Sequence, residues 1–373
     1  MKFRIESQDL KRAASWTRSV SERVQADRIL GCVLLESEAD AVKFRGTDRN
    51  IEIECRVDAQ VEQNGETTVS ATTLNDFARR LPDGSQVSFE HIANLEQLRI
   101  SSNRTNANLP TLPARTFPRM ASEEYDNSFS LNADELGRLF EKSKIAVCQD
   151  SSREYLCGVN MHLATEEGRR LLRCVATDGF QMAIVETRAP ENFEEMHTTI
   201  VPSKAAGEII KIFLRGDGPV MVAFTDSKIR FSNQTVSLSS RLLDGGRFPN
   251  YASLIPQNNP LKLTVDPDML RDALLRVSVV ADRPERSVAF ELEENSLQMT
   301  VQDPAVGLVK EVIPVDFPHG KYSVGFKHGH LLAIIDQIGD GNLVFRFQSE
   351  PGAVRITTDS DKSLLYLLMP LKV

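Results

Sequence analysis

The sequence predicts an α+β protein made of three repeated domains, each with two helices packed on antiparallel sheets. Three observations favour this class. The chain has 373 residues, which is more than one hydrophobic core usually serves. Two sequence patterns each occur three times, and strand pairs with alternating apolar residues lie between them. Polar stretches near residues 123–126 and 258–260 place the expected domains at 1–124, 125–258 and 259–373.

The first pattern opens each repeat with a short alternating strand, a polar residue with an acid or a proline, and an amphipathic helix. Its three copies are MKFRIESQDLKRAAS, NSFSLNADELGRLFE and LKLTVDPDMLRDALL. In the first helix Leu10, Ala13, Ala14, Val20 and Val24 form an apolar stripe, which predicts the face that packs on the strands.

The second pattern follows downstream in each repeat and predicts a strand, a small or polar cap, a helix of about ten residues, a turn and an alternating strand. Its copies begin with TTVSATTLNDF, TTIVPSKAAGE and YSVGFKHGHLL. Each turn contains Asp and Gly. The glycines Gly84, Gly218 and Gly341 suit a helix C-terminus that enters a left-handed conformation.

Basic side chains recur on most of these helices. On any one helix they usually form a solvated face, but their repetition raises the alternative that they line one shared surface. The residues are Lys11, Arg12, Arg18, Arg23, Arg79, Arg80, Arg138, Lys142, Lys144, Lys204, Lys211, Arg215, Arg271 and Arg276. The formal net charge of −8 disfavours a dedicated nucleic-acid binder unless the positive charge is gathered on one surface.

Composition excludes several other classes. The longest apolar runs are far shorter than the roughly 18 residues of a membrane span, and no apolar signal segment opens the chain, so we expect a cytoplasmic protein. Five cysteines without a CxxC pair indicate reduced, buried thiols. The pair His328 and His330 is a weak metal motif, and we expect a solvated turn or helix start there, with no metal.

The stretch RCVATDGFQMAIVE places Asp178 at a tight turn between two alternating strands. The chain has no phosphate-binding loop, GxGxxG, HExxH or GxSxG motif, and no histidine or second carboxylate stands beside Asp178 in the sequence. Counterparts recur at Asp48 and Asp303. We therefore expect this aspartate to shape a turn by accepting backbone hydrogen bonds, and we predict no catalytic residue and no cofactor.

The three repeats, with ATDGFQMA in the second and LLYLLMPLKV at the end, closely resemble the bacterial sliding clamps, the beta subunits of DNA polymerase III. The resemblance covers the whole chain, from MKF through LPARTFP, REYLCGV, VATDG, IVPSK and DGGRFPNY to the tail. It implies the DNA clamp fold, with two chains joined head to tail into a dimeric ring that holds duplex DNA without base-specific contacts.

The implied function is processive DNA synthesis through tethering of the polymerase, without a catalytic site in this chain. The implied partners are double-stranded DNA, the DNA polymerase III alpha subunit, the clamp loader delta subunit, other clamp-motif proteins and a second copy of the chain. Because this chain has no nucleotide motif, the ATP-driven loader must be a separate protein.

The resemblance also implies three sets of site residues. A hydrophobic pocket for a short motif with a Gln and a Leu-Phe type end is expected at Arg153, Tyr155, Leu156, Thr177, Gly179, Met182, Pro249, Leu254, Leu368, Met369, Pro370 and Leu371. The residues expected to face DNA are Arg23, Arg79, Gln149 and Lys204. Those expected at the dimer interface are Ala107, Val279 and Val280.

Several positions depart from the family pattern. Phe180 and Gln181 stand where His and Arg are usual, so we expect a less basic pocket rim. Glu154 replaces an aromatic residue that lies near DNA, the loop SERVQADR lacks the usual glycine and proline spacing, and Ala107 replaces a common Phe. Two alternatives stay open: an oligomeric protein-interaction module that does not encircle DNA, and an enzyme that uses Asp178, which would need a cleft with a perturbed acid–base pair.

Overall fold

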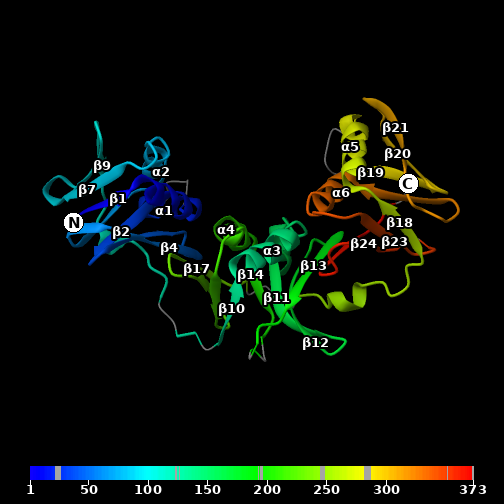
Figure 1. Ribbon diagram of the computed structural model, residues 1–373, viewed down its shortest axis with the longest axis horizontal. Helices are drawn as coiled ribbons and strands as arrows, with labels where there is room; N and C mark the ends of the chain where they lie inside the picture. Colours follow the sequence, from blue (N-terminus) through cyan, green and yellow to red (C-terminus); the bar gives the residue numbers. More distant parts are fainter. Residues whose placement is uncertain are drawn as a thin grey trace. The chain divides into compact units, whose positions relative to one another are not determined.

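The computed structural model describes residues 1–21, 27–121, 124–125, 127–191, 193, 196–243, 248–280, 287–350 and 352–371. The chain divides into two compact units, and Figure 1 labels the helices and strands that they contain. Unit 1 contains residues 1–137 and 208–242, and unit 2 contains residues 138–207 and 243–373. The division falls inside the helices α3 (Ala133–Lys144) and α4 (Ser203–Phe213), so the second repeat contributes to both units. The three-domain boundaries expected from the sequence stay a prediction.

Unit 1 contains two antiparallel sheets. The five-stranded sheet has the order β5-β1-β7-β8-β9, and the eight-stranded sheet has the order β10-β15-β16-β17-β4-β3-β2-β6. The strands are β1 (Lys2–Glu6), β2 (Cys32–Glu38), β3 (Ala41–Thr47), β4 (Ile51–Asp58), β5 (Gln60–Gln63), β6 (Gly65–Ser70), β7 (Gln86–Ile92), β8 (Gln97–Ser102), β9 (Thr105–Pro110), β10 (Asn127–Asn132), β15 (Pro219–Phe224), β16 (Lys228–Ser232) and β17 (Val236–Arg241). Pairing of β4 with β17, with Ile53 opposite Leu238, joins the first repeat to the second.

Unit 2 has the same plan. Its eight-stranded sheet has the order β14-β11-β12-β13-β25-β24-β23-β18, and its four-stranded sheet has the order β21-β20-β19-β22. The strands are β11 (Gly158–Glu166), β12 (Arg169–Thr177), β13 (Gln181–Arg188), β14 (Thr199–Pro202), β18 (Leu261–Val265), β19 (Ser287–Glu293), β20 (Ser296–Asp303), β21 (Gly307–Pro314), β22 (Tyr322–Lys327), β23 (Leu343–Phe347), β24 (Val354–Thr358) and β25 (Leu364–Leu368). Here β13 pairs with β25, with Met182 opposite Leu367.

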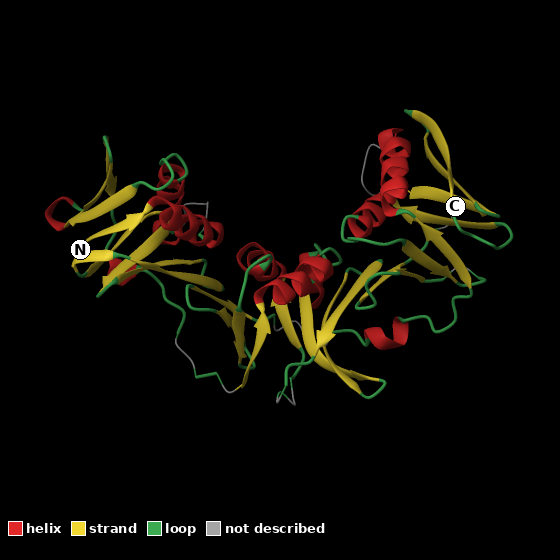
Figure 2. Ribbon diagram, viewed as in Figure 1, coloured by secondary structure: helices red, strands yellow, loops and turns green. Residues whose placement is uncertain are grey.

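The remaining helices confirm the prediction of two helices in each repeat (Figure 2). They are α1 (Ser7–Val20), α2 (Ala71–Ala78), α5 (Pro267–Val277) and α6 (His328–Ile335). Local chemistry fixes the start of α5: the Asp266 side chain accepts a hydrogen bond from the Met269 amide, and Pro267 occupies the first turn. No helix in the described part of the chain is long and apolar enough to cross a membrane.

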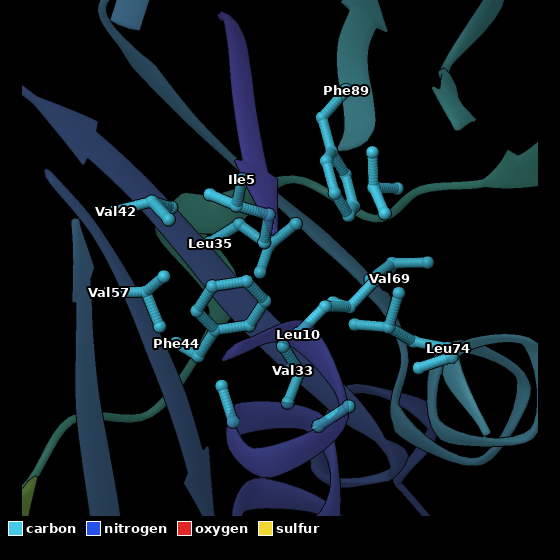
Figure 3. Packing of buried hydrophobic residues seen from close by; sticks show 14 of the residues in the cluster. Ile5, Leu10, Val33, Leu35, Val42, Phe44, Val57, Val69, Leu74 and Phe89 are labelled. Atoms are coloured by element: carbon cyan, nitrogen blue, oxygen red, sulfur yellow. The ribbon is translucent and has the colours of Figure 1, made fainter. Parts of the chain in front are cut away.

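The core of unit 1 lies where α1 and α2 pack against strands of both sheets (Figure 3). Leu10 from α1 and Leu74 from α2 meet Phe44, Val69 and Phe89 from three strands, and all five side chains are fully buried. The predicted apolar stripe of the first helix is therefore confirmed as its packing face from Leu10 to Val20, while Val24 lies outside the described residues.

One glycine sets how closely α1 approaches the sheet. Gly46 in β3 lies under the end of α1, and a Cβ atom at this position would stand 2.4 Å from the Thr17 carbonyl oxygen. Only glycine leaves room for that approach, because the obstacle is helix backbone rather than a flexible side chain.

The prediction for the turn glycines is half correct. Gly84, Gly218 and Gly341 have the expected positive φ, at 71°, 82° and 95°. They do not end the helices, however, since they lie in the turns that lead into β7, β15 and β23. The C-caps of α2 and α6, Arg79 and Asp336, have right-handed backbone conformations. The sequence pattern identified the required conformation but assigned it to the wrong end of the turn.

The five cysteines are all free thiols, and four of them are buried. Cys157 is half-buried, which departs from the expectation that all five are buried. Burial raises the pKa of the Cys55 thiol to about 12.

Replacing Gly46 by alanine is expected to lower the free energy of unfolding by roughly 2 to 3 kcal/mol, because α1 must shift away from β3. Urea unfolding followed by circular dichroism and by the fluorescence of Trp16, the one tryptophan, measures the change. Gly320→Ala is the matched control, since its Cβ would meet nothing within 4 Å. Equal stability of the two variants would contradict the close approach.

Candidate functional site

The turn between β12 and β13 is built by side chains that bind backbone. The Thr177 hydroxyl donates to the Gln181 carbonyl (2.7 Å), and Asp178 Oδ1 accepts from the amides of Phe180 (2.7 Å) and Gln181 (2.9 Å). Gly179 supplies the positive φ of 92° between them. The expectation that Asp178 shapes a turn is confirmed.

The same device recurs in the other two repeats. Asp48 Oδ1 accepts from the amides of Asn50 (2.9 Å) and Ile51 (2.7 Å). Asp303 Oδ1 accepts in the same way from the second and third residues after it, at 2.7 and 3.0 Å. Recurrence of the geometry explains the recurrence of the residue, since each aspartate satisfies two amides at a strand-to-strand turn.

The fold brings a histidine to Asp178 that is remote in the sequence. His330 in α6 places Nε2 3.8 Å from Asp178 Oδ2. That same oxygen accepts from Gln181 Nε2 at 3.2 Å, so both carboxylate oxygens hold local structure. The neighbouring His328 begins α6 as expected but is buried, which corrects the expectation of a solvated position. Among the described residues no group of three or more His, Cys, Asp or Glu side chains could hold a metal ion.

Two exposed apolar side chains lie at this turn, and a third lies in a short helix that packs on the same sheet. Phe180 is 48% exposed and Met369 is 47% exposed, and the Met369 amide donates to the Phe180 carbonyl at 2.8 Å. Leu254, 55% exposed, ends the short helix η5 (Tyr251–Leu254). The Lys327 ammonium lies 4.6 Å from the centre of the Phe180 ring. Large exposed apolar side chains of this kind mark interaction surfaces when they cluster.

Tyr251 fixes η5 on the sheet. It packs with Met182, Leu367 and other apolar side chains on one face of the eight-stranded sheet of unit 2. Its hydroxyl lies 2.8 Å from Nε2 of the half-buried His162. Burial, with the nearby charge of Arg173, lowers the pKa of His162 to about 4, so the ring is neutral near pH 7. A neutral polar pair inside the sheet thus anchors the segment that carries Leu254.

The other residues expected in the pocket differ in burial. Leu156, Thr177, Met182 and Leu368 are buried; Arg153, Tyr155, Pro249, Pro370 and Leu371 are half-buried; Gly179 is exposed. Arg153 Nη1 donates to the Asp178 carbonyl at 2.9 Å, and the Leu371 amide donates to Gly325 in β22 at 2.8 Å. The buried members belong to the core of the sheet, so the accessible apolar atoms come chiefly from Phe180, Leu254 and Met369. The terminal strand is therefore core up to Leu368 and surface beyond it.

The two substitutions at the rim have different environments. Phe180 is exposed, whereas Gln181 is buried and donates through Nε2 to the Ile145 carbonyl at 3.1 Å. Only Phe180 therefore presents its side chain to a ligand. Glu154 is exposed in the short helix η4 (Ser151–Leu156).

Three of the residues expected to face DNA are described, and all three are exposed. Arg79 follows α2 in unit 1, while Gln149 precedes η4 and Lys204 lies at the start of α4, both in unit 2. Arg23 lies outside the described residues. Among the residues that the structure describes, Arg79 has no carboxylate within salt-bridge distance.

Many of the basic helix residues are already paired with acceptors in the chain, so fewer of them are available to a shared basic surface. Arg138 binds Asp361 (2.6 Å) and Ser363, and Lys142 donates to the Gln337 carbonyl at 2.6 Å. Further salt bridges join Lys11 to Asp83, Arg12 to Asp9, Lys211 to Glu208, Arg271 to Asp336 and Arg276 to Glu311. Arg215 lies beyond the end of α4 with a positive φ of 62°, so it does not continue the helix face.

Two sheet edges carry the residues expected at a dimer interface. Ala107 is half-buried in β9, an edge strand of unit 1. Val279 is 78% exposed and Val280 only 9%, in a short helix that contacts the edge strand β21. Leu308 and Val312 on β21 are also exposed. The sequence reading missed both, although apolar residues on the outer face of an alternating strand are a usable signal.

The whole chain is similar to known proteins. Models of the DNA polymerase III beta subunit match it throughout: the N-terminal domain over residues 1–121, the central domain over 130–250 and the C-terminal domain over 252–372. The beta sliding clamp of Caulobacter vibrioides is 34% identical over 373 residues, and that of Escherichia coli K12 is 27% identical over 374 residues. Each match covers 100% of both chains.

Solved structures of sliding clamps are also similar to the whole chain. A DNA polymerase sliding clamp from Caulobacter crescentus has a TM-score of 0.90 at 34% identity, and each chain is covered completely. A Bartonella birtlesii sliding clamp, solved with griselimycin bound, has a TM-score of 0.94 at 30% identity, again over 100% of both chains.

A fall in pH is expected to lower the stability of unit 2 through His162. Its folded pKa, about 4, lies below the unfolded value, so the unfolded chain takes up the proton first as the pH falls. This group alone should remove about 2 kcal/mol of stability between about pH 7 and about pH 5. Urea unfolding at both pH values should show a smaller loss in His162→Gln than in the unmodified chain. The control His197→Gln changes an exposed histidine and should keep the full loss; an equal loss in all three proteins would contradict the assignment.

Proposed function

Because this chain belongs to the DNA polymerase III beta subunit family and functions as a DNA sliding clamp, we propose that it holds its replication partners at the exposed apolar side chains beside the Asp178 turn. It is a processivity factor and not an enzyme. The observation that carries the proposal is the group Phe180, Leu254 and Met369, which comes from three separate segments but stands on one sheet framework.

The chemistry of this group suits a short linear motif. Met and Leu side chains offer adaptable apolar surface, and Phe180 adds a ring with a cation beside it. Arg153 and the exposed backbone of Gly179 supply polar contacts that can orient a motif containing Gln. We assign this role to the motifs of the DNA polymerase III alpha subunit, the clamp loader delta subunit and other clamp-binding proteins. Phe180 should favour motifs with an apolar or aromatic residue at the rim.

Ring closure in our proposal uses the open sheet edges. Strand β9 ends the five-stranded sheet and β21 ends the four-stranded sheet. Pairing β9 of one copy with β21 of the next would make a sheet comparable in size with the two eight-stranded ones. It would also cover Val279, Leu308 and Val312, which are otherwise exposed apolar surface next to an edge. Such a contact is head to tail, and two of them close a ring.

Duplex DNA inside the ring would be held weakly. Arg79, Gln149 and Lys204 are the candidates for phosphate contact, and the pairing of many other helix cations lowers the number available. Contacts to phosphate carry no sequence preference, and a small number of them gives modest affinity. A ring that must slide needs both properties. The setting we propose is the bacterial cytoplasm, with a separate ATP-driven protein that opens the ring.

Substitutions at the partner site are expected to weaken the binding of a labelled peptide that ends in Gln-Leu-x-Leu-Phe. Met369→Ala and Leu254→Ala should each raise the dissociation constant about tenfold in fluorescence anisotropy, because each removes apolar surface that the peptide covers. Leu95→Ala, at an exposed leucine in unit 1, is the control and should bind as the unmodified chain does. Unchanged binding by both site variants would place the peptide elsewhere.

A charge on the exposed edge surface is expected to open the dimer. Leu308→Glu and Val279→Glu should each shift the mass measured by light scattering at micromolar concentration from dimer toward monomer, because the contact would bury an unpaired carboxylate. Met221→Glu alters an exposed methionine on β15 and should leave the mass unchanged. A dimer that tolerates both edge charges would rule out β21 as the contact strand.

A further inference from the structure

Unit 1 repeats the backbone framework of the partner site. The Thr47 hydroxyl donates to the Ile51 carbonyl at 2.8 Å, as Thr177 donates to Gln181 at 2.7 Å in unit 2. The Arg49 amide donates to Thr47 Oγ1 at 2.9 Å, and its φ of 74° places it in the left-handed region, as for Gly179. The turns after β3 and after β12 therefore have the same construction.

The neighbouring segments also correspond. The Arg241 amide at the end of β17 donates to the Asn50 carbonyl at 2.8 Å, as the Met369 amide at the end of β25 donates to Phe180 at 2.8 Å. The segments that pass over the two turns read FPRMA at 117–121 and FPNYA at 248–252. Turn, strand end and connecting segment thus occur twice in the chain.

The chemistry of the two places is different. Arg241 occupies the position of Met369, and Glu52 occupies that of Met182. Where Met182 packs with Tyr251, Glu52 Oε2 instead accepts from the Met120 amide at 3.0 Å. A polar tether replaces apolar packing, and it holds the connecting segment over the turn.

A pocket of about 330 Å³ lies at this place in unit 1. Its walls include four cationic side chains, Arg49 from the turn, Arg119 from the connecting segment, Lys228 from β16 and Arg241 from β17. The volume is within the range of ligand pockets and larger than one small anion needs.

Two of these four cations already bind carboxylates within the chain. Arg49 binds Asp27 at 2.7 Å, and Arg119 binds Glu36 at 2.9 Å and Glu66 at 3.1 Å. Arg241 is exposed, and no carboxylate among the described residues lies within salt-bridge distance of it. Carboxylate is thus the natural acceptor for this set, and one guanidinium is available for a carboxylate from outside.

We propose that this pocket binds an acidic, extended segment of a protein partner, through carboxylates that engage Arg241 and the cations beside it. An extended segment fits better than a single anion, because the cations come from four separate places around the pocket. The occupant differs in chemistry from the apolar motif of the partner site. The two sites can therefore be filled independently.

The test is fluorescence anisotropy of a labelled hexaglutamate peptide, at about 50 mM and about 200 mM salt. The full chain should bind it saturably, and more weakly at the higher salt. Arg241→Gln should weaken binding about fivefold, the effect of one partly exposed ion pair, and Arg241→Glu more strongly. Arg56→Gln is the matched control: it removes an exposed arginine of β4 that lies outside the pocket, and should change nothing. Thermal unfolding confirms that each variant is folded.

Competitors separate the possible occupants. An unlabelled Gln-Leu-x-Leu-Phe peptide should leave hexaglutamate bound, and displacement would overturn the independence of the two sites. Displacement by millimolar inorganic phosphate would show a small-anion site. A single-stranded oligonucleotide that binds more tightly than hexaglutamate, and whose binding is lost in Arg241→Gln, would show a nucleic-acid site. Either result overturns the proposal, as does equal hexaglutamate affinity in Arg241→Gln and Arg56→Gln.

Discussion

Main-chain pairing across the boundaries of the repeats is the interaction on which the rest of the structure depends. β4 pairs with β17, and β13 pairs with β25, so each eight-stranded sheet contains strands of two repeats. Backbone amides and carbonyls along a strand need partners, and these pairings supply them where a repeat alone would leave an edge. Both turns with bound Thr and Asp side chains stand beside these pairings. The sites follow from the way the repeats are joined.

The repetition of sequence patterns made much of the fold and of the turn structure predictable. A strand-and-helix pattern that occurs three times reports on the fold more reliably than one copy, and the recurrence of Asp48, Asp178 and Asp303 indicated a turn device instead of catalysis. Short-range hydrogen bonds from a side chain to the next amides depend only on local sequence, which is why they could be inferred.

Contacts between distant segments could not be inferred in the same way. Nothing in the helix pattern indicates that Arg138 binds Asp361, or that His330 reaches Asp178, since both contacts join elements far apart in the chain. The exposure of Leu308 could not be predicted either, because the alternation of a strand does not indicate which of its faces is covered. The resemblance suggested the residues of the partner site, but only some of them are accessible. Leu368, for example, lies in the core, whereas Met369 lies at the surface.

The place of β25 in its sheet has a consequence for synthesis of the chain. This strand is the last of its sheet in sequence order, yet it lies between β13 and β24 in the interior of the sheet. On the ribosome, β11 to β14 emerge long before the strand that must flank them, and they wait with an open edge. Unit 1 is completed by β17, ending at Arg241, and can close while the ribosome is still translating. The second sheet can close only after β25 has been synthesised, so until then the nascent chain is exposed to aggregation.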